Sequence, residues 1–139
     1  MAFPPNASKL AAYRSTSAHA GVAAADPHRL VVMLMDGALD RIATARGLMV
    51  HGDVAEKAQL LQRAVAIIDE LRNSLNLKAG GELSHNLDAL YEYMCMRLVQ
   101  ANASNKPEWL DEVSRLLNEI RSAWLALPAQ GRAQVAQRP

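Results

Sequence analysis

Four histidines and one cysteine are the residues whose chemistry could serve a metal site or a reaction. His19, His28, His51 and His85 lie far apart, and none has the i, i+4 partner of a helical zinc site or the Glu-x-x-His pattern of a di-iron bundle. Cys95 lies in an apolar run with no adjacent base, which is typical of a buried structural thiol. With no glycine-rich phosphate loop either, we expect no metal, no cofactor and no catalytic site, so the chain is predicted not to be an enzyme.

A histidine phosphotransfer bundle is the one reaction-bearing class that the histidines leave open. Such a module needs an exposed histidine on a helix, and His28 or His85 could be read in that way. Neither lies mid-helix among the small and basic neighbours that such a site would use. Acid-labile phosphate on either residue would support this alternative, which the sequence disfavours.

Methionine pairs indicate a different kind of site. Met33 and Met35 form one i, i+2 pair, and Met94 and Met96 form another, so the two members of each pair point to different sides of a helix. Methionine adapts its shape, which suits a surface that accepts a flexible partner, although a single methionine in a helix more often fills the core. The predicted partner-binding residues are Leu10, Tyr13, Val31, Met33, Met35, Met94 and Met96.

The helix that follows Asp26 is predicted to be apolar on every side. Asp26 suits the N-cap and Pro27 the first helical position, where its missing N–H costs nothing. Residues 30–35 are apolar without a break, and at roughly 100° per residue they cover the whole circumference. A single apolar stripe is enough for a helix to pack against one core. The remaining apolar surface of this helix must therefore face another helix, the chain's own N-terminal segment, or a partner. We expect this helix to end at His51-Gly52.

Three further helices are expected from their boundary signals. Asp53, with Glu56 three residues later, makes a capping box for the helix that follows. Residues 80–81 are both glycine and close the next connection. Ser104 or Asn105 is expected to cap the last helix, which Pro128 ends.

Each of these three helices has an apolar stripe at helical spacing, which should face the core. The expected inward residues are Val54, Leu61, Ala64, Ile68, Leu71 and Leu75, then Leu83, Leu87, Leu90, Met94, Leu98 and Ala101, and finally Trp109, Val113, Leu116, Leu117, Ile120 and Trp124. No alternation typical of strands competes with these stripes. The predicted fold is therefore all-α, an antiparallel four-helix bundle with an additional short, mobile N-terminal helix or segment. The expected divisions are a mobile segment or cap at 1–25, the bundle at 26–127 and a disordered tail at 128–139.

Composition excludes several functional classes. Fifteen basic and fourteen acidic residues give a net charge of +1 without a basic stripe, so binding of nucleic acid by phosphate neutralisation is disfavoured. No apolar run approaches the roughly 18 residues of a membrane span, and the first ten residues lack the pattern of a signal peptide. A single cysteine fits a reducing compartment. We therefore expect a cytoplasmic protein with no membrane insertion.

Several separate motifs occur together in one order and spacing. They are Tyr13, residues 26–30 (DPHRL) leading to 34–38 (LMDGA), residues 80–83 (GGEL) with Asn86-Leu87, residues 90–94 (LYEYM), Arg97-Leu98, Ala101-Asn102 and residues 119–124 (EIRSAW). In these motifs the chain resembles the flagellar secretion chaperones, the FliS family, over roughly residues 10–127. Two positions depart from that family's usual pattern, since Met35 stands in place of Tyr and Asp26 in place of Ser.

The resemblance implies an export chaperone that binds the C-terminal segment of flagellin, prevents premature polymerisation and delivers it to the flagellar type III export gate. It also implies an antiparallel helical bundle with a movable N-terminal segment. We expect a monomer or a weak dimer. A homo-oligomeric helical adaptor stays open as an alternative, because a symmetric interface would bury the same surplus apolar surface. Light scattering would favour the adaptor if it gave a dimer mass that does not change with concentration.

Overall fold

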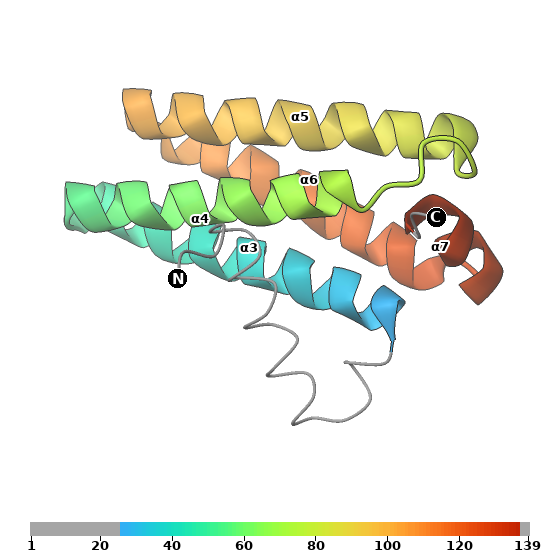
Figure 1. The fold of residues 1–139 in the computed structure, drawn as a ribbon. Coiled ribbons are helices and arrows are strands. Elements are labelled where there is room, and N and C mark those ends of the chain that lie inside the picture. The colour runs from blue at the N-terminus through green and yellow to red at the C-terminus, as the bar shows by residue number, and fades with distance from the viewer. Residues whose placement is uncertain (1–25, 137–139) are drawn as a thin grey trace, which may run out of the picture.

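The computed structural model describes residues 26–136 as an all-α protein. The predictions that fall on residues 1–25, including Leu10 and Tyr13, lie outside the described residues. The helices of the described range are α3 (Pro27–His51), α4 (Val54–Asn73), α5 (Gly81–Ser104), α6 (Pro107–Ala126) and α7 (Ala129–Ala136). The long helices α3 to α6 run alternately in opposite directions along one axis, and α7 lies across one end (Figure 1). The predicted antiparallel four-helix bundle is confirmed.

The four long helices form a square in cross-section. Helix α3 lies against α4 and α6, and α5 lies against the same two helices. Alanines at the contacts, such as Ala38, Ala64 and Ala101, are wholly buried, and such small side chains let helix backbones approach closely. Because α3 is covered by α4, α6 and α7 together, most of its surplus apolar surface is met by other helices of the same chain.

Two of the predicted helix starts are confirmed, and one is wrong. The side chain of Asp26 accepts from the N–H of His28 at 3.0 Å, and that of Asp53 accepts from the N–H of Ala55 at 2.8 Å. The N-cap of α6 is Lys106, without a side-chain hydrogen bond, rather than Ser104 or Asn105. Asn105 instead ends α5 in the left-handed conformation, with φ of 53°, which asparagine tolerates better than most residues.

The segment 128–139, expected to be disordered, contains helix α7 within its described part. Val135 is only 4% exposed, and its carbonyl accepts from the backbone N–H of Asn76 at 2.8 Å and from the buried Ser84 hydroxyl at 3.2 Å. Gly80 makes this contact possible, because a Cβ there would lie 1.7 Å from the Ser84 oxygen. One apolar anchor and two hydrogen bonds therefore order a segment whose composition is mostly polar.

A buried lysine joins three helix ends at the opposite end of the bundle. Lys57, near the start of α4, is 4% exposed, and its Nζ donates to the backbone oxygen of Asn102 at 3.2 Å and to Oδ1 of Asn105 at 3.1 Å. The Asn105 amide donates in turn to the backbone oxygen of Met49 at 3.4 Å. The lysine thus satisfies carbonyl groups that the C-terminus of α5 would otherwise leave unpaired.

Replacing Lys57 by methionine is expected to destabilise the protein by about 1 to 3 kcal/mol, because buried acceptors lose their donor while the apolar stem is retained. Urea denaturation followed by circular dichroism measures this change. The matched control is Lys78→Met, since Lys78 is exposed in the α4–α5 connection. Equal stabilities of the two variants would contradict a structural role for the Lys57 ammonium group.

Candidate functional site

The first half of α5 has an apolar stripe that the bundle does not cover. Leu83 is 44% exposed and Leu90 is 36% exposed, with Leu87 half-buried between them. Further along the same stripe, Met94 and Leu98 are wholly buried. The prediction that this entire stripe faces the core is therefore wrong for its first two turns, where the leucines line a groove instead.

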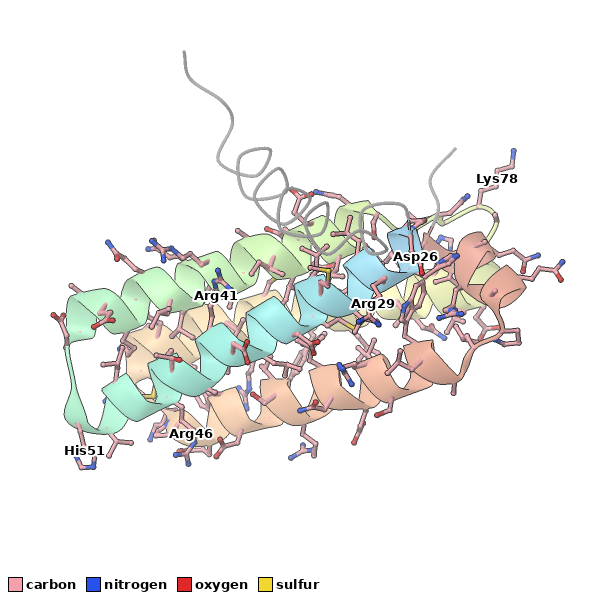
Figure 2. All side chains as sticks on the ribbon, turned by 90° about the horizontal axis from the view of Figure 1, so that it is seen from below. Asp26, Arg29, Arg41, Arg46, His51 and Lys78 are labelled. Carbon is pink, nitrogen blue, oxygen red and sulfur yellow. The ribbon has the colours of Figure 1, made fainter. Side chains whose placement is uncertain are left out.

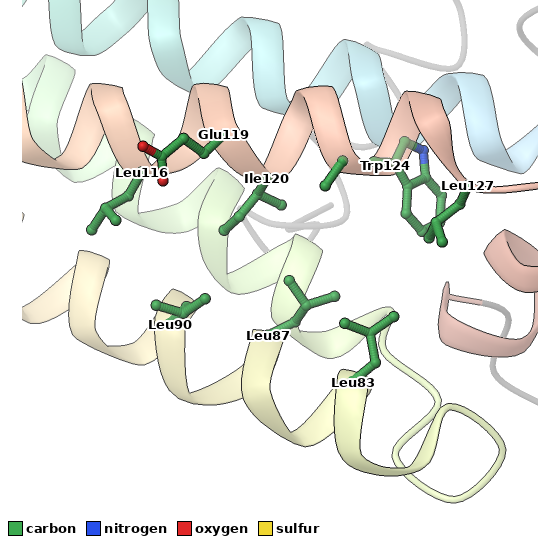
Figure 3. Close-up of a pocket in the computed structure, with 9 residues that line it drawn as sticks. Leu83, Leu87, Leu90, Leu116, Glu119, Ile120, Trp124 and Leu127 are labelled. Atoms are coloured by element: carbon green, nitrogen blue, oxygen red, sulfur yellow. The ribbon is translucent and has the colours of Figure 1, made fainter.

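Helix α6 forms the opposite wall of this groove. Figure 3 shows the three leucines of α5 facing the side chains of α6 across an open space of about 320 Å³. The residues contributed by α6 and the turn after it are Leu116, Glu119, Ile120, Ala123, Trp124 and Leu127. We call this space the α5–α6 groove. Glu119 is the only lining residue with a charged side chain.

Polar contacts close the other half of the contact between α5 and α6. The Tyr93 hydroxyl donates to Glu112, 2.9 Å from each carboxylate oxygen, and Arg97 Nε donates to the same carboxylate at 2.8 Å. The Arg97 guanidinium also lies 4.2 Å from the ring centre of Trp109. The hydrogen bonds from Arg97 and then Tyr93 hold the pKa of the Glu112 carboxyl below its usual value. These contacts confine the opening to the half where α5 presents leucines.

Trp124 joins the groove to the start of α3. Its side chain is 4% exposed, and its Nε1 donates to the backbone oxygen of His28 at 3.2 Å, with the two ring centres 5.9 Å apart. The prediction that Trp124 faces inward is confirmed. The beginning of α3, where the N-terminal segment joins the bundle, therefore lies beside the Trp124 end of the groove.

A smaller groove of about 210 Å³ lies between α4 and the second half of α5. Val99, on its edge, is 60% exposed. The lining also includes the polar side chains of Gln62 and Asn102. This second groove therefore offers less continuous apolar surface than the α5–α6 groove.

None of the predicted partner-binding residues in the described range lines the α5–α6 groove. Met35 and Met94 are wholly buried in the core, and Val31 is 8% exposed. Met33 is half-buried, and Met96 is 50% exposed on α5. A partner could reach Met35 or Met94 only if the bundle opened, so of this set Met96 is the one that a partner could touch most directly. Their role in binding stays a prediction.

Of the described histidines, His28 lies in the first turn of α3, His51 at its last residue, and His85 near the start of α5. Within residues 26–136 no group of three or more His, Cys, Asp or Glu side chains could hold a metal ion. The Cys95 thiol is half-buried, and its Sγ lies 3.6 Å from Oδ1 of Asp69. Burial, with the Asp69 charge second, raises the pKa of this thiol to about 12, which keeps it protonated and unreactive at neutral pH.

Basic side chains are scattered over the bundle surface. Arg29, Arg41, Arg46, His51 and Lys78 lie apart from one another in Figure 2, with His51 at one end and Lys78 at the other. They do not form the stripe that a phosphate backbone requires. Within the described range, no helix is both long enough and apolar enough to span a membrane.

Comparison with known proteins shows similarity along most of the chain. Residues 9–131 match the family model described as flagellar protein FliS. The chain is 51% identical over 112 residues to the flagellar secretion chaperone FliSB of Pseudomonas aeruginosa, covering 81% of this chain and 89% of that protein. It is 39% identical over 121 residues to the flagellar secretion chaperone FliS of Vibrio cholerae, with 87% and 89% covered. The corresponding protein of Salmonella typhimurium is 42% identical over 119 residues, with 85% and 88% covered.

Proposed function

The chain belongs to the FliS family of flagellar secretion chaperones, and we propose that it binds the C-terminal segment of flagellin in the cytoplasm, prevents its premature polymerisation and delivers it to the flagellar type III export gate. The family consists of chaperones rather than enzymes.

The observation that supports this proposal most strongly is the α5–α6 groove. Its α5 wall leaves Leu83 and Leu90 exposed and Leu87 half-buried, and its lining is more continuously apolar than that of the groove between α4 and α5. Exposed apolar surface of this kind marks binding sites, because leaving it in water is unfavourable. We propose that the flagellin segment covers this groove.

The physical logic of such binding is that the terminal segments of flagellin polymerise through apolar faces. A chaperone that covers one of these faces removes it from the assembly reaction. A segment that orders only on binding gives up conformational entropy at that step, which keeps a large interface releasable.

Isothermal titration calorimetry with a peptide of the flagellin C-terminus tests the proposal. We expect saturable binding with a negative heat-capacity change, because apolar surface leaves water. The helical circular dichroism signal of the mixture should exceed the sum of the signals of the separate protein and peptide. The absence of any heat of binding, together with unchanged circular dichroism, would contradict flagellin binding.

The N-terminal segment is proposed to compete with flagellin for this groove. Residues 1–25 contain the apolar side chains Leu10 and Tyr13, and the segment joins the bundle at α3, whose first turn contacts Trp124 at the end of the groove. Full burial of one such side chain stabilises by about 1.5 to 3 kcal/mol, and the entropy of ordering the segment opposes it. A cap of this kind would lower the affinity for flagellin only modestly.

Removing residues 1–25 is therefore expected to tighten flagellin binding by up to roughly tenfold, or about 1.4 kcal/mol, while promoting self-association. Calorimetry on the truncated and full-length proteins measures the change. The full-length double variant Leu10→Ser with Tyr13→Ser is the control that keeps chain length. If truncation abolishes binding, the segment is part of the site and the cap hypothesis is wrong.

A further inference from the structure

The α5–α6 groove contains one charged residue in an otherwise apolar lining. Glu119 on α6 is exposed, and within residues 26–136 its carboxylate takes part in no hydrogen bond or ion pair. Figure 3 shows Glu119 beside Leu116, at the opposite end of the groove from Leu127. The groove therefore has a charged end and an apolar end.

The apolar lining restricts the conformation of whatever occupies the groove. An extended peptide would bury most of its backbone N–H and C=O groups against aliphatic side chains, which can neither donate nor accept hydrogen bonds, and each unpaired group costs free energy. A helix satisfies these groups internally. The groove walls are themselves two helices, so a third helix can pack its ridges between them.

The dimensions of the walls suit a short helical segment. Leu83 and Leu90 are seven residues apart on α5, which is about 10 Å at roughly 1.5 Å per residue. Leu116 and Leu127 span about 16 Å on the α6 side by the same measure. A guest of two to three helical turns, with apolar side chains at i, i+3 or i+4, and i+7, therefore matches the length of the groove.

We propose that the α5–α6 groove binds one amphipathic helix of its partner, and that Glu119 pairs with a lysine or arginine at one end of that helix. The charge at one end sets the direction in which the helix lies, because the reversed orientation would place the guest's cation against leucines. This inference rests on the proposed function, since the partner is taken to be the flagellin C-terminal segment.

Designed peptides test the chemistry of the groove without flagellin. Four synthetic 18-residue helical peptides present leucines at i, i+3, i+4 and i+7, with a single lysine at four successive positions along the edge of the apolar face. A matched set has glutamate in place of the lysine, and one further peptide has a central proline. Fluorescence anisotropy measures their affinity for the full-length protein and for its Glu119→Lys and Asp40→Lys variants.

The expected result is that one lysine position gives the tightest binding and that Glu119→Lys weakens it about fivefold, as for a partly exposed ion pair. The same variant should strengthen binding of the matching glutamate peptide by a similar factor. Asp40→Lys makes the same change of charge at an exposed position of α3. This variant should still bind the lysine peptide more tightly than the matching glutamate peptide. The proline peptide should bind at least tenfold more weakly. Equal effects of the two variants, no binding of any lysine peptide, or undiminished binding of the proline peptide would each overturn the inference.

Repeating the measurement with the flagellin C-terminal peptide separates the two proposals. If the designed peptides obey the Glu119 dependence while flagellin does not bind, the proposed function fails and the chemistry of the groove stands. If flagellin binds and Glu119→Lys changes neither its affinity nor that of the designed peptides, the inference fails and the proposed function stands.

Discussion

Replacing Leu90 by glutamate is expected to lower the affinity for the flagellin C-terminal segment by about 100-fold or more, without unfolding the bundle. Leu90 is 36% exposed on the wall of the α5–α6 groove, so the free protein can keep the new carboxylate hydrated. In the complex, the apolar contact is lost and a charge must be desolvated against leucines. The two costs together reach about 3 kcal/mol, which corresponds to more than 100-fold in affinity.

Val99→Glu is the matched control for this experiment. Val99 lies on the same helix, is 60% exposed and lines the smaller groove on the α4 side. Calorimetry should give nearly normal affinity for this variant, and thermal unfolding should show that both variants keep their fold. A loss confined to Val99→Glu would move the binding site to the groove between α4 and α5.

Replacing Trp124 by alanine is expected to destabilise the protein by about 3 to 5 kcal/mol, which is a large share of the stability of a typical domain. The indole is 4% exposed, packs in the core and holds the start of α3 through its hydrogen bond to His28. Its removal leaves a cavity and takes away the hydrogen bond that ties α6 to the backbone of α3. Urea denaturation measures the loss.

Trp109→Ala is the corresponding control, because Trp109 is half-buried and contacts Arg97 across the α5–α6 contact. We expect a smaller loss of stability than for Trp124→Ala. A Trp124→Ala protein with a normal melting temperature that had lost only partner binding would instead make Trp124 a residue of the binding surface alone.

Local signals in the sequence were sufficient to predict the helices and most of the core. Asp26 and Asp53 cap α3 and α4 as expected. The N–H groups in the first turn of a helix have no acceptor within the helix, and the neighbouring carboxylate supplies one. The stripe predicted for α6 is confirmed at Val113, Leu117 and Trp124, which are buried. Trp109 and Leu116 of the same stripe are half-buried. Periodicity succeeds for the buried residues because they lie where α6 packs against α3 and α5.

The α5–α6 groove could not be predicted in the same way. Leu83 and Leu90 have the same helical spacing as the buried Met94 and Leu98, so the pattern marks all four as one face. Whether such a face is covered depends on how far α5 and α6 separate along their length, which is a property of the assembled bundle. Glu119 is the first residue of the motif at 119–124 (EIRSAW), but nothing in the neighbouring sequence indicates that its side chain lines a groove.

Contacts distant in the sequence account for the other differences. Met35 was expected on a partner surface because residues 30–35 are all apolar, yet its helix has neighbours on several sides and the side chain is wholly buried. Lys57 and Val135 are buried through partners 45 and 51 residues away, respectively. No local pattern reveals such pairs.

The most direct test of the account is methyl NMR of the full-length protein with labelled leucine and methionine, titrated with the flagellin C-terminal peptide. The proposed binding mode predicts that the methyl signals of Leu83, Leu87 and Leu90 shift first and most strongly, followed by Leu116 and Leu127, while Met96 changes little. Shifts confined to Met96, or to Leu61 and Leu98 in the groove between α4 and α5, with the leucines of the α5–α6 groove unchanged at saturation, would contradict it.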